Sequence, residues 1–277
     1  MEKIGLSDGM VKTSKRKRLT PSAAPGPATE TGLKKHRSGV TLRKTQPSGR
    51  RAERLTIAVD GPSGAGKSTV ARFLAERLGY VYIDTGAMYR SLALRAKERG
   101  VPLEDEVTLG RLALSLHVHF VTEGGQTHVF CEGENVTEAI RTPEISRLAS
   151  SISKQKGVRE AMVKLQREMG KQGGVVLEGR DIGTVVFPDA DVKFYLDANP
   201  EERARRRYDE MVEKGVKADF RETQEDLLQR DHNDMHRVHS PLKKANDAVF
   251  IDSSHRSVEE VVEEIVRVIE ERIESFQ

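Results

Sequence analysis

Apolar residues after residue 54 fall into short runs that alternate with stretches of helical spacing. The run at 55–60 is apolar and β-branched, which indicates a buried strand. Apolar positions at Val70, Phe73, Leu74 and Leu78 then lie on one face of a helix. Similar runs predict further buried strands, at 80–83, 175–177, 192–196 and 249–251. This alternation predicts an α/β fold, a parallel sheet core with helices on both faces.

The helices expected between these strands have recognisable ends. A helix from about Ala87 to Arg99 stops at Gly100, a residue that suits the position after a helix. Pro200 is expected in the first turn of another helix. Ser257 and Glu260 form a capping box for a C-terminal helix. The apolar face of that helix holds Val258, Val261, Ile265, Ile269 and Ile273.

Residues 103–157 depart from this alternation. A short helical pattern at 112–116 precedes three short, closely spaced strands, which we expect at 118–121, 128–131 and 134–136. Helices follow at about 143–152 and 158–169. Closely spaced strands pair through tight turns, so we expect a small antiparallel β insertion within the parallel fold.

Residues 1–53 show no hydrophobic period. They contain a basic run at 15–18, several prolines and many Ser, Thr and Gly residues. Such a stretch buries too little apolar area to offset the entropy of ordering it, so we expect a disordered basic tail. Three interpretations of the tail stay open: a solvated extension, a nonspecific contact with nucleic acid, or a transit peptide. The domain itself is expected at 54–277.

Charge and composition narrow the function classes. Residues 1–54 hold 14 Lys or Arg and 4 Asp or Glu residues, while the whole chain holds 46 and 43, so the folded part is mildly acidic. The single cysteine excludes an internal disulfide and fits a reducing, cytoplasmic setting. No apolar run approaches about 18 residues, and no apolar segment opens the chain, so we expect neither a membrane span nor a secretory signal.

The most specific local signal is a phosphate loop between the first strand and the first helix. Gly61–Ser68 fits G-x-x-x-x-G-K-[ST] without a mismatch. Glycines let the backbone wrap a polyphosphate with its N–H groups inward, and the helix N-terminus adds partial positive charge. Lys67 can reach the β and γ phosphates, and the Ser68 hydroxyl can ligate Mg²⁺. The expected ATP-binding residues are Gly61, Pro62, Ser63, Gly64, Ala65, Gly66, Lys67, Ser68 and Thr69.

Polar and basic residues follow the other strands. Asp84, Thr85, Tyr89 and Arg90 stand at the carboxyl edge of the second strand, where ligands bind in open α/β sheets. Arginine offers a planar fork of donors that suits phosphate oxygens, although a single arginine is more often a solvated surface group. The candidates are Arg90, Arg159, Arg180, Arg203, Arg206, Arg207, Arg230 and Arg237.

These stretches resemble the bacterial-type cytidylate kinases, the CMP/dCMP kinases within the nucleoside monophosphate kinase family of P-loop proteins. The resemblance covers about residues 55–275 and rests on the motifs at 59–68, 84–90, 179–190, 201–204 and 230–237. The Gly179-Arg180-Asp181 stretch is far more specific than the phosphate loop, which many families share. Thr85 and Glu178 stand where similar proteins often carry Ser and Asp; Thr keeps the hydroxyl.

The resemblance implies an enzyme that transfers the γ-phosphate of ATP to CMP or dCMP with Mg²⁺, as a monomer with small-molecule partners. The insertion at about 103–157 would bind the acceptor, and a lid at about 200–225 would close over the donor. The implied catalytic residues are Lys67, Arg180, Arg203, Arg206 and Arg207, the last three on the lid. Asp84 and Tyr89 would belong to the acceptor site. Its phosphate would be held by Thr85, Arg90, Arg180 and Arg237, its ribose by Arg230 and Asp234, and its cytosine by Ser150, Arg159 and Asp181.

Other functions make distinct demands on the sequence. A kinase of another small acceptor, such as a different nucleotide or shikimate, fits the phosphate loop but not the insertion and the Gly-Arg-Asp stretch. A GTP-dependent switch would need an Asn-Lys-x-Asp stretch, which the chain lacks. A nucleic-acid-binding module would rely on the basic tail, which offers no aromatic platform for stacking.

Three histidines near the C-terminal end form a pattern that could indicate a metal site. His232, His236 and His239 have helical spacing, with Asp231 beside the first, and could face a metal ion. No glutamate completes a metalloprotease motif, so we expect a solvated or phosphate-neighbouring face instead.

Overall fold

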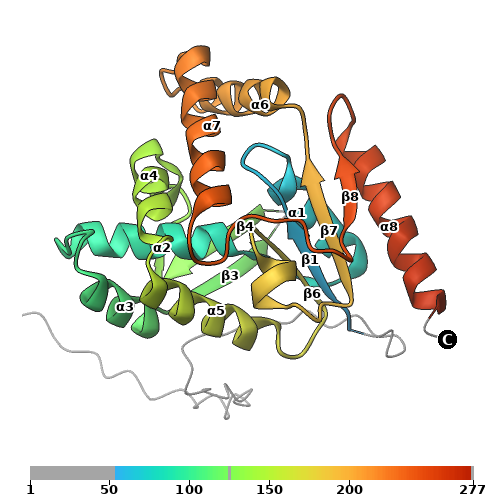
Figure 1. The fold of residues 1–277 in the computed structure, drawn as a ribbon, viewed down its shortest axis with the longest axis horizontal. Coiled ribbons are helices and arrows are strands. Elements are labelled where there is room, and N and C mark those ends of the chain that lie inside the picture. Colours follow the sequence, from blue (N-terminus) through green and yellow to red (C-terminus); the bar gives the residue numbers. More distant parts are fainter. Residues whose placement is uncertain (1–53, 124–125, 276–277) are drawn as a thin grey trace, which may run out of the picture. The chain divides into compact units, whose positions relative to one another are not determined.

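The computed structural model describes residues 54–123 and 126–275. The expected basic tail at 1–53 lies outside the described residues, so the prediction of its disorder stays a prediction. Figure 1 shows the arrangement of the described elements.

A parallel sheet of five strands carries the fold. Its order is β2-β6-β1-β7-β8, so the strand that leads into the phosphate loop is central. The strands span β1 Thr56–Asp60, β2 Val81–Asp84, β6 Val175–Gly179, β7 Val192–Asp197 and β8 Val249–Asp252. Every neighbouring pair is parallel, which brings the carboxyl ends of the strands to one edge.

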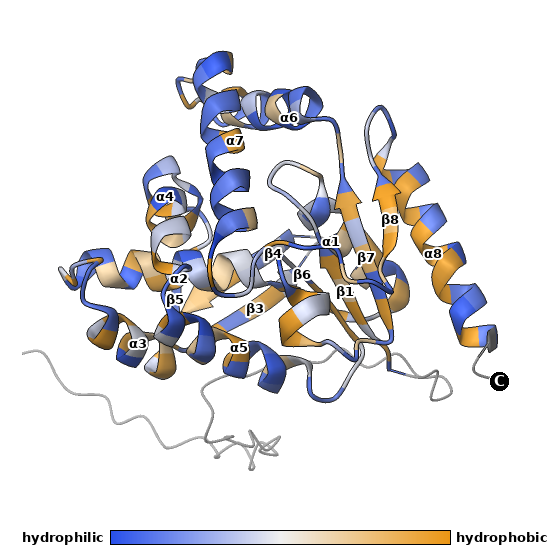
Figure 2. Cartoon of the chain, viewed as in Figure 1, coloured by the Kyte–Doolittle hydropathy of each residue, from blue (hydrophilic) through white to orange (hydrophobic). Residues whose placement is uncertain are grey.

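Helices cover both faces of this sheet, because alternate strand residues point to opposite sides. Ile57 and Val59 pack with α1 (Lys67–Leu78) and α8 (Val258–Ser275) on one face. Ala58 between them packs on the other face with α2 (Thr85–Glu98) and α5 (Lys156–Gly170). Figure 2 shows the central strands mostly in the colour of hydrophobic residues. The predicted fold class is confirmed.

The insertion forms its own small sheet. The element α3 (Glu106–Ser115) precedes an antiparallel sheet of order β3-β4-β5. Its strands are β3 Val118–Glu123, β4 Gln126–Cys131 and β5 Glu134–Asn135. A short 3₁₀ turn, Ala139–Arg141, leads into α4 (Pro143–Ile152). Arg95 of α2 connects this sheet to the helix, because it donates hydrogen bonds to the Cys131 carbonyl (2.8 Å) and to Glu134 (2.7 Å).

Two helices, α6 (Pro200–Glu213) and α7 (Phe220–His236), pack on each other beyond the carboxyl ends of the strands (Figure 1). Their residues are mostly hydrophilic (Figure 2), as expected of a pair with solvent on several sides. Asn199 and Asp219 cap their N-termini with side-chain oxygens. Pro200 opens α6 as predicted.

Two local details differ from the sequence pattern. A π-helical turn, Ile182–Val186, follows the Gly-Arg-Asp stretch and was not predicted. The helix α7 ends at His236, so His239 does not share its face. The predicted capping box is confirmed by hydrogen bonds from Ser257 N to Glu260 (2.8 Å) and from Glu260 N to Ser257 (3.2 Å).

Within residues 54–123 and 126–275, none of the helices combines the length and the apolar character needed to cross a membrane.

Candidate active site

A cavity of about 1280 Å³ opens at the carboxyl edge of the parallel sheet. Its walls come from the phosphate loop, the ends of β2 and β6, the insertion, and the helices α4, α6 and α7. Most of the residues predicted from the sequence meet here. The predicted residues that line it are Ser63, Gly64, Ala65, Gly66, Lys67, Ser68, Thr69, Asp84, Thr85, Tyr89, Arg90, Ser150, Arg159, Arg180, Asp181, Arg206, Arg207, Arg230, Asp234 and Arg237.

The phosphate loop needs glycine for two physical reasons. Gly61, Gly64 and Gly66 all have positive φ, at 149°, 77° and 88°. A Cβ atom at Gly61 would lie 1.9 Å from the Leu196 carbonyl oxygen, and one at Gly64 would lie 2.8 Å from the backbone of α6. The loop is therefore pressed between β7 and α6, and only glycine leaves room for this approach.

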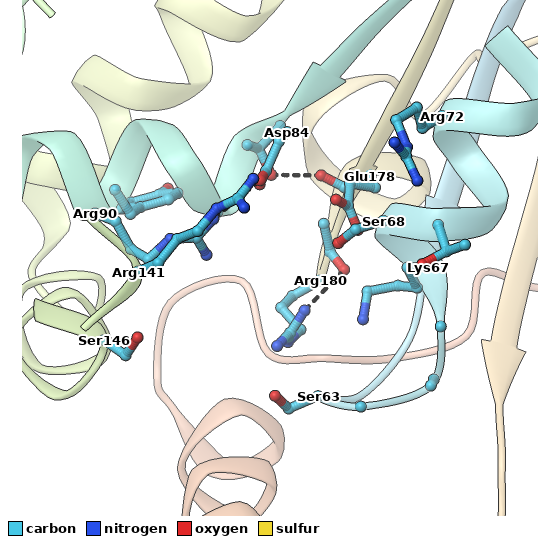
Figure 3. A pocket seen from close by; sticks show the side chains of 18 of the residues that line it. Ser63, Lys67, Ser68, Arg72, Asp84, Arg90, Arg141, Ser146, Glu178 and Arg180 are labelled. Atoms are coloured by element: carbon cyan, nitrogen blue, oxygen red, sulfur yellow. Dashed lines mark hydrogen bonds and ion pairs between the residues drawn. The ribbon is translucent and has the colours of Figure 1, made fainter. Parts of the chain in front are cut away.

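Lys67 begins α1 and is only 5% exposed. Its ammonium donates a hydrogen bond to the Pro62 carbonyl at 2.5 Å, which holds it against its own loop. Burial and the nearby charge of Arg180 lower its pKa to about 7. In Figure 3 Lys67 and Arg180 point into the same open space. Additional negative charge in that space would stabilise both cations.

Glu178 near the end of β6 is a site residue that the predicted set omits. It is 4% exposed, and it accepts a hydrogen bond from the Tyr82 hydroxyl at 2.5 Å. Burial and the neighbouring Asp84 raise its pKa, while Lys67 and Ser68 lower it. Figure 3 shows Ser68, Glu178 and Asp84 at one wall of the cavity. The signal in the sequence was an acidic residue directly after the apolar run at 175–177.

Four arginines add positive charge to the lining of the cavity. Arg90 pairs with Asp84 at 2.9 Å, and Arg180 donates to Asp234 at 2.8 Å. Burial and the charge of Arg180 lower the pKa of Arg230 to about 10. The lining arginines here are Arg90, Arg180, Arg230 and Arg237. Such a concentration of guanidinium groups favours a phosphate group.

Behind these arginines lies a buried ion pair. Arg159 of α5 and Asp181 after β6 form a short, direct ion pair, and Arg237 lies 3.4 Å from the same carboxylate. Arg159 and Asp181 are only 3% and 5% exposed. The guanidinium of Arg159 also lies over the ring of Tyr89, 5.8 Å from its centroid. A donor and an acceptor of fixed geometry thus meet at the inner end of the cavity.

The three predicted lid arginines have different positions. Arg206 lines the cavity and donates to the carbonyl of Ser253 at 2.7 Å. Arg207 lines it too and pairs with Glu210 at 2.7 Å.

Arg203 is not among the residues that line the cavity. It is 5% exposed, pairs with Asp231, and donates to the Ser63 carbonyl at 2.9 Å. The structure therefore places Arg203 behind the phosphate loop, where it supports the loop backbone. Gly61 and Pro62 likewise form the base of the loop and do not line the cavity.

The insertion and α4 contribute residues that the sequence did not single out. Arg141, at the end of the 3₁₀ turn, and Ser146 of α4 both line the cavity (Figure 3). Their only sequence signal was membership of the insertion. Among the described residues, no group of three or more histidine, cysteine or acidic side chains is arranged to hold a metal ion.

Comparison with known proteins adds an independent finding. The family model described as "Cytidylate kinase" matches residues 57–271. A protein named cytidylate kinase from Geobacter sulfurreducens is 52% identical over 81% of this chain and 96% of its own length. Relatives of the same name from Syntrophotalea carbinolica and Bacillus subtilis are 52% and 47% identical, over 79% of this chain in both cases and 93% and 98% of their own lengths.

Proposed function

The chain belongs to the cytidylate kinase family, and from that premise we propose that it transfers the γ-phosphate of ATP to CMP or dCMP, giving ADP and CDP or dCDP. One observation carries the proposal. A single cavity joins the phosphate loop, a cluster of arginines and a buried Arg159–Asp181 pair. These three parts match a donor polyphosphate, an acceptor phosphate and an acceptor base.

The donor site follows from the loop. The backbone N–H groups and the N-terminus of α1 suit the phosphates of ATP, and Lys67 adds a compact cation. The oxygens of Ser68, Glu178 and Asp84 form a hard donor set that fits Mg²⁺. The raised pKa of Glu178 beside Asp84 supports this fit, because a cation would relieve the repulsion between the two carboxylates. When bound with ATP, Mg²⁺ would supply positive charge to the phosphate oxygens.

The acceptor brings its own nucleophile. A phosphate monoester has a second pKa near 6, so it is largely a dianion at neutral pH and needs no general base. Arg90, Arg180 and Arg237 would hold and orient this phosphate, and Thr85 would contribute its hydroxyl. The reaction then depends on in-line positioning and on cations that offset charge on the transferred group. Lys67 and Arg180 face the space in which that charge would develop.

The buried pair would read the base. Cytosine presents an amino donor at C4 and acceptors at N3 and O2, whereas uracil presents an acceptor at C4 and a donor at N3. Asp181 only accepts and suits the amino group, while Arg159 only donates and suits N3 and O2. Ser150 can do either and would discriminate little. Uracil would instead place its O4 acceptor against Asp181 and its N3–H donor against Arg159, and these two mismatches would give the pocket its selectivity.

The helix pair α6 and α7 would supply a lid, at about 200–225. Arg206 and Arg207 line the cavity while they are bonded to Ser253 and Glu210, so binding of the donor would require them to exchange these partners for phosphate oxygens. Closure would also exclude water, which otherwise competes as the acceptor. The insertion at about 103–157 would cover the acceptor from the other side.

A coupled assay of ATP consumption across CMP, dCMP, UMP, AMP, GMP and shikimate tests the proposal. We expect CMP or dCMP to be preferred over UMP by at least about two orders of magnitude in kcat/KM. Equal use of UMP, or a better rate with a purine nucleotide or shikimate, would overturn it. The expectation of a monomer stays a prediction, which size-exclusion chromatography with light scattering would test. Residence in the cytoplasm stays a prediction.

A further inference from the structure

Asp60, the last residue of β1, is a buried carboxylate that none of the proposed steps uses. It is 4% exposed and stands directly before Gly61 of the phosphate loop. Both of its oxygens accept hydrogen bonds from backbone outside the loop. One accepts a hydrogen bond from the backbone N–H of Ile182 at 2.8 Å, and the other accepts from the N–H of Gly183 at 2.7 Å.

These two N–H groups begin the π-helical turn that follows Asp181. The first N–H groups of a helical turn have no partner inside the turn and need an external acceptor. The Asp181 side chain does not cap the turn, although it holds the preceding position. Its carbonyl accepts from Val185 and Val186, at 2.9 and 3.1 Å. The carboxylate of Asp60, 122 residues away in sequence, therefore acts as the cap.

The turn also has little freedom to move toward another position. A Cβ atom at Gly183 would lie 3.1 Å from the side chain of Lys193 and 3.5 Å from the Asp60 carboxylate. Gly183 is thus packed between two charged side chains. On the far side of the turn, Arg167 donates to the carbonyls of Val185 and Val186 at 2.7 and 2.8 Å. Both ends of the turn are held by hydrogen bonds from other elements.

We propose that Asp60 is a positioning residue for base discrimination: its carboxylate fixes the turn after Arg180 and Asp181, and so fixes Asp181 against Arg159. The inference rests on the proposed function. Because Asp60 also ends the strand that leads into the phosphate loop, it ties the base-reading side chain to the strand that carries the donor site. An ionised carboxylate suits this role, since it offers an acceptor at each oxygen and no donor that would oppose an N–H group.

The free-energy cost of burying the Asp60 carboxylate supports a role for it beyond packing. Burial raises the pKa of Asp60 to about 6, against the effect of its two hydrogen bonds with Ile182 and Gly183. A buried carboxylate is retained at a cost in free energy, and here both of its oxygens are used on one turn.

The test compares Asp60→Asn with a matched control, Asp191→Asn. Asp191 accepts from the N–H of Thr56 at 2.6 Å through a single oxygen, so the same substitution at the opposite end of the same strand removes a charge but leaves an acceptor for this bond. In Asp60→Asn, the side-chain amide would present its NH₂ group to one of the two backbone N–H donors. We expect this variant to raise the KM for CMP about tenfold or more, as loss of a charge-assisted bond does. We also expect the ratio of kcat/KM for CMP to that for UMP to fall by a similar factor, while the KM for ATP stays within about twofold.

Asp191→Asn should leave the KM for CMP and the CMP:UMP ratio of kcat/KM unchanged. An equal loss of kcat/KM for CMP, UMP and ATP would overturn the inference. So would an unchanged CMP:UMP ratio of kcat/KM in a folded Asp60→Asn protein. If Asp60→Asn does not fold, Gly183→Ala perturbs the same turn from the other side, because the added methyl would lie 3.1 Å from the Lys193 side chain and in contact with the Asp60 carboxylate. A Gly183→Ala protein with the wild-type CMP:UMP ratio would likewise overturn it.

The wild type separates this inference from the proposed function. If the wild-type protein does not prefer CMP to UMP, the proposed function fails before any variant is compared. Calorimetric titration of CMP alone provides a second readout that does not depend on turnover. The inference requires weaker CMP binding by Asp60→Asn and unchanged binding by Asp191→Asn.

Discussion

Replacing Asp181 by alanine should destabilise the protein strongly, before any effect on catalysis is considered. The substitution removes the carboxylate that pairs with Arg159 and lies 3.4 Å from Arg237. The two arginines, Arg159 and Arg237, keep different partners after this substitution. Arg237 keeps the Ser240 carbonyl at 2.6 Å and Asp234 at 3.8 Å. Within the described part of the chain, the hydrogen bond that Arg159 keeps is the long one to the Ser153 carbonyl, at 3.4 Å.

The magnitude follows from the burial of Arg159. Its side chain is 4% exposed, and its Nε atom already has no hydrogen-bond partner among the described residues. Breaking a buried pair by removing one partner typically costs about 3–5 kcal/mol, because an uncompensated charge stays buried. For a domain of this size, each kcal/mol corresponds to a fall in Tm of about 2–4 °C. We therefore expect Asp181→Ala to lower Tm by roughly 6–20 °C.

Urea unfolding of Asp181→Ala and of Asp181→Ala/Arg159→Met tests this reasoning. Methionine is long, flexible and uncharged, so the double variant should recover much of the lost free energy of unfolding. It should nevertheless lose most of its preference for CMP, because both of the groups that we propose to read the base are gone. Recovery of stability without recovery of selectivity would separate the two roles of the pair. A loss below about 1 kcal/mol in the single variant, or a double variant no more stable than the single one, would refute the assignment of the cost to Arg159.

Three further predictions follow from the described residues. Lys67→Ala should lower kcat by about three orders of magnitude or more with an unchanged Tm, because the ammonium lies where transferred charge would develop; near-normal turnover would refute a catalytic role for the loop lysine. Arg206→Ala should lower kcat/KM for ATP about tenfold or more, whereas Arg205→Ala, whose side chain is exposed, should have little effect in the same assay. The pKa of Asp60 is raised from its usual value to about 6, so the folded state binds a proton more tightly than the unfolded state, and this group stabilises the fold less as pH rises. Wild type should therefore gain about 1 kcal/mol relative to Asp60→Asn between pH 7 and pH 5, measured by urea unfolding at both values; an unchanged difference would show that Asp60 titrates normally.

Local sequence was sufficient for most of the elements and for recognising the phosphate loop. The phosphate loop is recognised within eight residues, because its glycines, its lysine and the adjacent strand and helix act through neighbouring backbone. The capping box at Ser257 and Glu260 is local for the same reason. The insertion was visible as a change from alternating strands and helices to closely spaced short strands.

The roles of Arg203 and Arg206 show where local information stopped. The two residues are three positions apart on α6, so helical spacing places them on one face. Arg203 nevertheless supports the back of the phosphate loop, and Arg206 lines the cavity. Spacing fixes the direction of a side chain relative to its helix, whereas the group it meets depends on how that helix packs against distant segments.

Asp60 and Glu178 show the same limit of local sequence, because the predicted site residues omitted both of them. Each ends or nearly ends a buried strand, and the sequence marked neither as a site residue. Asp60 acquires its role from Ile182 and Gly183, and Glu178 from Tyr82 and Ser68. The sequence alone determined which residues sit at the carboxyl edge of the sheet. Only the tertiary structure decided which of them are buried together, because the energy of a buried charge depends on partners that lie far away in the chain.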